Sequence, residues 1–136
     1  MFKLAIFLLI VSPQITQPPI DKYIFEGYPV KFSCVASGDP TPTFVWTFND
    51  DDLPSGIRQN DQEGKSTLEL PPVTKEMEGT YKCTAINKEN KASSSATLYI
   101  YCKFNKEINV VISMKINVKM KIFRSEEHTS ELQSQR

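Results

Sequence analysis

Short stretches in which apolar and polar residues alternate run through the middle of the chain. In residues 29–37, PVKFSCVAS, every second position from Val30 is apolar or a cysteine, and residues 43–48, TFVWTF, repeat the pattern with aromatic side chains. The same alternation occurs in residues 66–70, 80–85 and 96–100. A period of two places successive side chains on opposite faces of an extended chain, so these segments predict strands with one buried face.

Turn-forming residues separate the predicted strands. The connecting segments GDPTP, NDDDLPSG, DQEGK and PPVTKEMEG are rich in Gly, Pro, Asp and Asn, which favour turns. No segment has a sustained helical period, and TKEMEG has room for one helical turn. Several short strands at this spacing indicate an all-β protein built as a sandwich of two sheets.

The predicted inward faces carry four side chains at informative spacings. Cys34 and Cys83 each lie within a predicted strand. Trp46 follows the first cysteine by twelve residues, and Tyr81 precedes the second by two. Together with the stretches EGYPVKFSC, GDPTPTFVW and CTAIN, this arrangement resembles the I-set of the immunoglobulin superfamily. The resemblance covers residues 13–101, about two thirds of the chain.

The resemblance implies an immunoglobulin-like antiparallel β-sandwich with a characteristic core. Cys34 and Cys83 would form a disulfide between the sheets, and Trp46 would pack against it. The Tyr81 hydroxyl would bond to the backbone a few residues upstream. The expected core also includes Phe32 and Leu70. In a reducing compartment the same two cysteines would instead be unpaired buried thiols.

Met77 is a departure from the family's pattern. Met77 stands four residues before Tyr81, where the family usually carries an aspartate that accepts hydrogen bonds or pairs with an arginine. Acidic residues flank it at Glu76 and Glu78. The departure puts an ion pair from this corner to Arg58 in doubt.

The first twelve residues, MFKLAIFLLIVS, combine one lysine with a short apolar run. This pattern resembles a secretory signal peptide. The run is shorter than the roughly 20 apolar residues that span a bilayer, so it predicts no transmembrane segment. Residues 1–12 can also be read as an intron-derived lead, since their codons are compatible with the end of an intron.

The end of the chain has a different composition from the middle. Residues 102–123 are rich in Lys, Asn, Ile and Met, which have A/T-rich codons, and are interpreted as intron read-through. Residues 124–134, RSEEHTSELQS, match the translation of a common sequencing-library adapter, and we extend that interpretation to residues 124–136. We therefore expect irregular or disordered termini around residues 13–101, and we give Cys102 little weight as a functional cysteine.

Charge and composition exclude several kinds of function. Residues 13–101 carry 8 Lys and Arg against 12 Asp and Glu, a net charge of −4, which disfavours nucleic-acid binding. The only histidine, His128, lies in the adapter-like tail, so no Ser-His-Asp or Cys-His arrangement is available. The acidic run at residues 50–52 favours a solvated loop over a calcium site. We expect no enzyme activity, metal, cofactor or small-molecule substrate.

Exposed apolar residues are the better candidates for a site. Val45, Ile86 and Tyr99 occupy outward positions on three strands that lie side by side in the family's fold. They are predicted to gather into one apolar and aromatic face that could bind a partner. The alternatives are that they are ordinary surface residues or are covered by a neighbouring domain.

The sequence therefore predicts a non-enzymatic protein-recognition module. The family resemblance implies an extracellular or cell-surface fragment of an adhesion molecule or receptor, with a protein ligand or a homophilic immunoglobulin partner. One alternative is an intracellular muscle-type I-set spacer whose cysteines stay reduced. Another is an ectodomain module of a receptor kinase or phosphatase.

Overall fold

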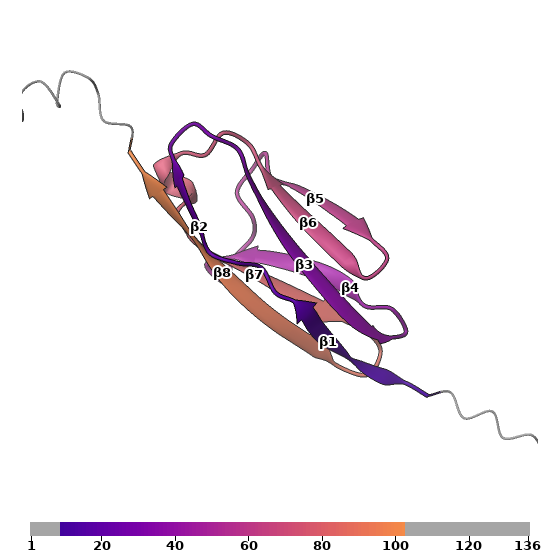
Figure 1. Ribbon diagram of the computed structural model, residues 1–136. Coiled ribbons are helices and arrows are strands. Elements are labelled where there is room, and N and C mark those ends of the chain that lie inside the picture. The colour runs from indigo at the N-terminus through magenta and orange to yellow at the C-terminus, as the bar shows by residue number, and fades with distance from the viewer. Residues whose placement is uncertain (1–8, 103–136) are drawn as a thin grey trace, which may run out of the picture. The chain divides into compact units, whose positions relative to one another are not determined.

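The computed structural model describes residues 9–102, which form two β-sheets packed face to face (Figure 1). Residues 1–8 and 103–136 lie outside the described part, together with most of the predicted lead and of the two predicted tails. The all-β sandwich predicted from the alternation is confirmed.

Each sheet has four strands. The first sheet has the order β1 (Val11–Gln17), β3 (Val30–Asp39), β6 (Lys65–Leu70), β5 (Arg58–Gln62). The second has the order β2 (Lys22–Phe25), β8 (Lys91–Tyr101), β7 (Gly79–Ile86), β4 (Thr43–Phe48). The five predicted strands correspond to β3, β4, β6, β7 and β8, and the single predicted helical turn is η1 (Lys75–Met77).

Three strands were not predicted from the sequence pattern. In β5, RQNDQ, every residue is exposed, so no apolar alternation marks it. In β1 the pairing with β3 is irregular at two points, and the strand begins at Val11, two residues before the expected domain start. The strand β2 pairs in parallel with β8, whereas every other strand pair in the described sheets is antiparallel. The chain reaches β2 by crossing between the sheets after β1 (Figure 1).

The space between the sheets is filled by the inward side chains. The fully buried ones include Phe32, Leu68, Leu98 and Ile100, and Leu70 is 3% exposed. Such a continuous apolar core is the main source of stability in a domain of this size. Inward positions of the five predicted strands supply nearly all of it.

The disulfide between Cys34 and Cys83, predicted from the family resemblance, is confirmed. It joins β3 to β7 across the core and closes a loop with a sequence separation of 49 residues. In the chain-entropy model, such a loop stabilises the folded state by about 4 kcal/mol.

A hydrogen bond crosses between the sheets beside the disulfide. The Trp46 indole N–H donates to the buried Ser66 hydroxyl oxygen at 2.9 Å. Trp46 pairs with Cys83 in the strand register, and Ser66 pairs with Cys34. The disulfide joins β3 to β7, and the hydrogen bond joins β6 to β4, their neighbours in the same two sheets. The two links therefore lie side by side, and both hold the sheets together.

The corner before β7 also follows the prediction from the resemblance. The Tyr81 hydroxyl donates to the backbone carbonyl of Met77 at 2.8 Å. Burial raises the pKa of Tyr81 to about 12, so the hydroxyl remains a donor at neutral pH. Its ring packs between Phe32 and Phe48, with centroids 5.1 Å and 4.9 Å away.

Replacing Trp46 with alanine tests the importance of the cross-sheet packing. The change removes a side chain that is 4% exposed and leaves Ser66 without its donor. We expect a loss of about 3–5 kcal/mol in the free energy of unfolding. Denaturant unfolding followed by circular dichroism measures it, with the exposed neighbour Val45→Ala as control. A loss of under about 1 kcal/mol would show that this packing is not central.

Candidate interaction surface

The outward face of the sheet β2-β8-β7-β4 carries the residues that the sequence singled out. Val45 is 47% exposed, Tyr99 39% and Ile86 36%, and they lie on β4, β8 and β7 respectively. All three alternate with buried neighbours, as predicted. The structure therefore places each of them on the solvent side of the same sheet.

The expectation that these three residues gather into one patch is wrong. In the register, Val45 pairs with Thr84, which makes Val45 and Ile86 diagonal neighbours. Ile86 pairs with Lys91, whereas Tyr99 lies eight residues further along β8. At about 3.3 Å per residue, Tyr99 lies roughly 26 Å along the strand from Ile86 and roughly 20 Å from the level of Val45. Spacing within each strand was predictable, but the register between strands was not.

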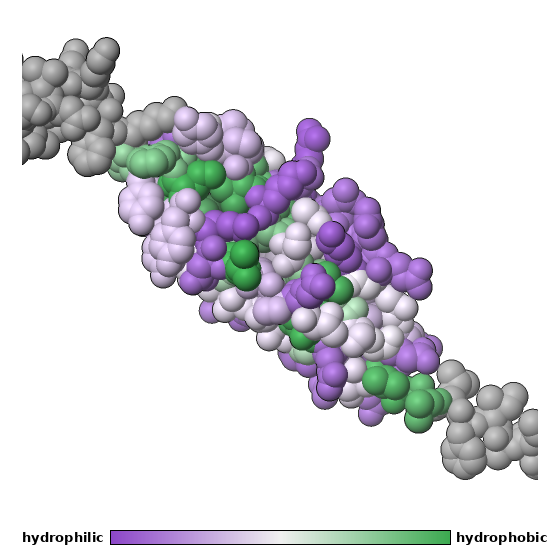
Figure 2. Space-filling view, viewed as in Figure 1, coloured by the Kyte–Doolittle hydropathy of each residue, from purple (hydrophilic) through white to green (hydrophobic). Residues whose placement is uncertain are grey.

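Polar residues occupy the surface between the two ends. The Thr84 and Ser93 hydroxyls are hydrogen-bonded across β7 and β8 at 2.9 Å. Lys82 forms an ion pair with Asp50 in the loop after β4. In the view of Figure 2, hydrophobic residues likewise form separate patches among hydrophilic ones. The face therefore has two distinct apolar regions and no continuous one.

Tyr99 belongs to an aromatic cluster at the end of β8. The cluster consists of Tyr23 and Phe25 on β2 together with Tyr99 and Tyr101 on β8. The rings of Tyr23 and Tyr99 stack with centroids 4.7 Å apart and an interplanar angle of 8°. Those of Phe25 and Tyr101 are tilted, with centroids 5.9 Å apart. The sequence analysis missed Tyr23 and Phe25 because it did not predict β2; their alternation, YIF, was the available signal.

The parallel pairing of β2 and β8 creates this cluster. It places Tyr23 opposite Tyr99 and Phe25 opposite Tyr101, so that all four rings lie on the outward face. The pKa of Tyr23 is raised, first by partial desolvation and then by Tyr99, Asp21 and Tyr101. The surroundings of this hydroxyl therefore disfavour an additional negative charge.

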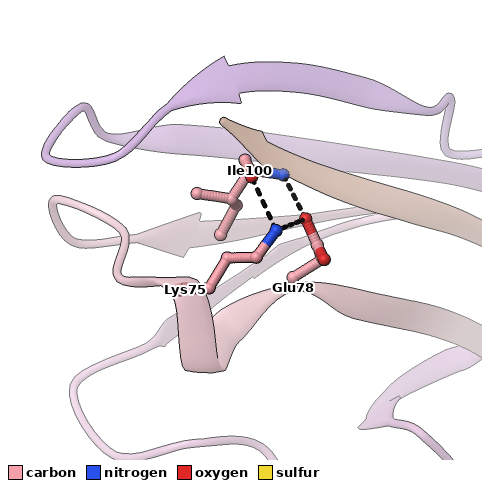
Figure 3. A network of polar contacts seen from close by, with 3 residues as sticks. All are labelled: Lys75, Glu78 and Ile100. Carbon is pink, nitrogen blue, oxygen red and sulfur yellow. Dashed lines mark hydrogen bonds and ion pairs between the residues drawn. The ribbon is translucent and has the colours of Figure 1, made fainter. Parts of the chain in front are cut away.

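A polar network holds the end of β8 in place (Figure 3). Lys75 Nζ donates to Glu78 Oε2 at 2.7 Å and to the Ile100 carbonyl at 2.8 Å. The Ile100 N–H donates to the same oxygen of Glu78 at 2.7 Å. Ile100 lies between Tyr99 and Tyr101 in β8, at a point that β7 does not reach, since its pairing ends at Gly79. The network thus fixes the backbone that carries two rings of the aromatic cluster.

At this corner the hydrogen-bond-accepting carboxylate is that of Glu78, one residue after Met77, where the family usually carries an aspartate. Met77 is instead partly buried against the core. The Lys75 side chain, followed by the Ile100 N–H, lowers the pKa of Glu78 by stabilising the carboxylate. Arg58 makes no ion pair with this corner among residues 9–102.

The other features that the sequence singled out can be located within residues 9–102. No group of three or more His, Cys, Asp or Glu side chains within this range is placed to hold a metal ion. In the acidic run, the Asp50 carboxylate pairs with Lys82, and the backbone N–H and carbonyl of Asp51 bond to those of Phe48. No helix in the same range is long and apolar enough to cross a bilayer. Cys102 is free and exposed.

Comparisons with known proteins agree with the fold and the disulfide. A family model described as "Immunoglobulin domain" matches residues 12–87. The chain is 38% identical over 96 residues to the basement membrane-specific heparan sulfate proteoglycan core protein of Mus musculus, covering 71% of this chain and 2% of that protein. It is 37% identical over 93 residues to the netrin receptor DCC of Rattus norvegicus, covering 68% and 6%.

Solved structures give a third comparison. Titin domain M7 superposes with a TM-score of 0.65 at 27% identity, covering 68% of this chain and 97% of that domain. The chain thus spans nearly all of one titin domain but only a few per cent of the curated relatives.

Replacing Glu78 with glutamine tests the network at the end of β8. Because the pKa of Glu78 is lowered in the folded state, its stabilising contribution is present above the unfolded value of about 4.3 and is lost as the pH falls below it. We expect the melting temperature of the parent chain to fall more steeply between about pH 5 and pH 3 than that of Glu78→Gln.

Glu76→Gln is the matched control, since Glu76 is exposed and makes no hydrogen bond or ion pair within residues 9–102. Thermal melting in a series of buffers provides the measurement. Parallel pH profiles for the parent and Glu78→Gln would contradict this role of Glu78.

Proposed function

Because the chain belongs to the immunoglobulin domain family, we propose that it is a non-catalytic protein-recognition module from an extracellular adhesion molecule or receptor. The proposal is supported by the disulfide across the core of a chain that is similar to parts of a netrin receptor and of a basement membrane proteoglycan. Structural disulfides persist in oxidising compartments and are rare in the cytosol.

The arrangement of the strands supports a place in a tandem array. The described chain begins with β1 at one end of the sandwich, and β8 finishes at the other (Figure 1). A module with this geometry can be joined end to end with others while both of its sheets stay exposed. We propose residues 13–101 as the module, with a signal or intron-derived lead in 1–12, intron read-through in 102–123 and an adapter-derived tail in 124–136.

We propose the outward face of β2-β8-β7-β4 as the recognition surface. It offers exposed aromatic and aliphatic side chains at both ends, including Val45, Ile86 and Tyr99. Aromatic residues are enriched in protein interfaces because they bury much area at low entropic cost. The partner is a protein ligand or a second immunoglobulin module.

An intracellular spacer is the second candidate. The superposition on titin domain M7 favours it, since the match extends over almost the whole of that domain. In that case the fold would stay the same while Cys34 and Cys83 remained reduced thiols. The two candidates therefore differ in the redox state of one pair of residues.

Thiol trapping separates the two candidates. Protein isolated from its native source is alkylated without reductant, and its mass is compared with a reduced and alkylated sample. The readout is the alkylation of Cys34 and Cys83, located by peptide mass. We expect neither cysteine to be alkylated before reduction and both to be alkylated after it. Alkylation of both in the unreduced sample would overturn the extracellular proposal in favour of the spacer.

A bead adhesion assay tests recognition itself. Beads densely coated with the full chain are expected to adhere to one another or to a protein-coated matrix surface. Protease treatment of the matrix surface should abolish adhesion of the beads to it. The double variant Ile86→Ser, Tyr99→Ala should adhere several-fold less. Gln62→Ser, exposed on the other sheet, is the control. Equal adhesion by the parent, the double variant and uncoated beads contradicts the proposal.

A further inference from the structure

The aromatic cluster lies at an open sheet edge. Its strand β2 is the outermost strand of the sheet, so in residues 9–102 no strand lies beyond it. One face of the Tyr23 ring is stacked on Tyr99, and its side chain is still 62% exposed. The other face of this ring is therefore available to a ligand that approaches along the edge.

A carboxylate stands next to this ring. Asp21 precedes β2, and its Oδ1 accepts the backbone N–H of Thr97 at 2.8 Å. That bond fixes the side chain at the β2 side of β8. Among the described residues no hydrogen bond reaches its Oδ2, and no ion pair involves Asp21. The influence of Asp21 on the Tyr23 pKa is consistent with their proximity.

The nearest cation on the same strand does not neutralise this carboxylate. Lys22 alternates with Tyr23, so it points to the opposite face of β2. There it lines a groove of about 450 Å³ together with Lys31. The outward side of the edge thus combines an aromatic face with an unneutralised negative charge.

The exposed area limits the size of the partner's contact. The exposed fraction is 62% for Tyr23, 51% for Phe25, 39% for Tyr99 and 51% for Tyr101. With about 200 Å² for each aromatic side chain, the cluster presents roughly 400 Å². A stable interface between two folded domains needs about 800 Å² from each. The cluster suits a short segment with one or two anchoring side chains better than it suits a second copy of the domain.

We propose that the aromatic cluster and Asp21 bind an arginine side chain presented by an extended segment of a partner protein. The guanidinium stacks on the open face of Tyr23 by a cation–π contact, and the nearby Asp21 carboxylate attracts its positive charge. Within the full chain, whose formal net charge is zero, residues 13–101 carry a net charge of −4, which favours a cationic segment at the module. This inference rests on the proposed recognition function and names its site and the chemistry of its ligand.

The test uses the full chain and the tri-arginine peptide acetyl-Arg-Arg-Arg-amide, with the citrulline peptide as its uncharged counterpart. Binding is followed by NMR of the aromatic rings at physiological salt. We expect saturable shifts at Tyr23 and Tyr99 with the arginine peptide and none with the citrulline peptide. Shifts of the same size with both peptides would overturn the proposal.

Two substitutions locate the site. Tyr23→Ser removes the stacking surface, and Asp21→Asn removes the charge but keeps the Oδ1 acceptor for Thr97. Each is expected to raise the dissociation constant between about twofold and fivefold. Asp52→Asn changes the net charge equally at a distant loop and is expected to leave binding nearly unchanged. Melting by circular dichroism identifies any variant that does not fold, in which case Tyr23→Leu replaces Tyr23→Ser.

The remaining outcomes are also decisive. If Asp52→Asn weakens binding as much as Asp21→Asn, the attraction is non-specific and the site is wrong. If sedimentation shows a dimer that Tyr23→Ser dissociates, the cluster is a self-interface and the proposal fails. If the peptide does not bind but the bead adhesion persists, the ligand chemistry is wrong while the recognition function stands.

Discussion

The separation of the two sheets is the constraint on which the rest of the structure depends. It is held at two adjacent points, by the disulfide between Cys34 and Cys83 and by the hydrogen bond from Trp46 to Ser66. The four residues form two cross-strand pairs, one in each sheet. A shift of either sheet would break both links at once. The inward positions of β3, β4, β6 and β7 are thereby fixed, and so are their outward positions.

The outward surface follows from this arrangement and from where each strand ends. β7 pairs with β8 only as far as Gly79, so the last residues of β8 extend past it. On one side of this extension lies β2, and on the other the Lys75–Glu78 pair holds Ile100. The aromatic cluster is therefore built on a well-supported piece of backbone although it lies at the margin of the sheet. A rigid backbone lowers the entropic cost of binding a ligand there.

At two other sheet edges, β4 and β1, a side chain from elsewhere in the fold occupies one backbone carbonyl. Gln59 donates to the Phe44 carbonyl at the edge strand β4, at 3.0 Å. Asn87 donates to the Val11 carbonyl at β1, at 2.7 Å. Such contacts occupy backbone groups that would otherwise be open to pairing with another chain. At the edge formed by β2 the exposed features are aromatic rings, which favour recognition through side chains.

The sequence by itself determined the class of fold and the core, and its resemblance to a family implied the cysteine pair. Strands such as 43–48 have a strict alternation, and burial on one face makes that alternation readable without any knowledge of neighbours. The Tyr81 hydroxyl bond to Met77 was likewise predictable, because the family's motif spans only a few residues. Patterns of this kind can be read from a few consecutive residues, without knowledge of how the rest of the chain folds.

Only the tertiary structure decided which surface residues meet. The register between β7 and β8 places Ile86 far from Tyr99, and no pattern within either strand encodes that register. Strand β2 is four residues long, and its parallel pairing brings Tyr23 to Tyr99 across a sequence separation that alternation cannot report. Glu78 similarly finds the Ile100 backbone by tertiary proximity. Burial leaves a periodic signal in sequence, whereas contacts between exposed side chains depend on pairing that only the folded chain establishes.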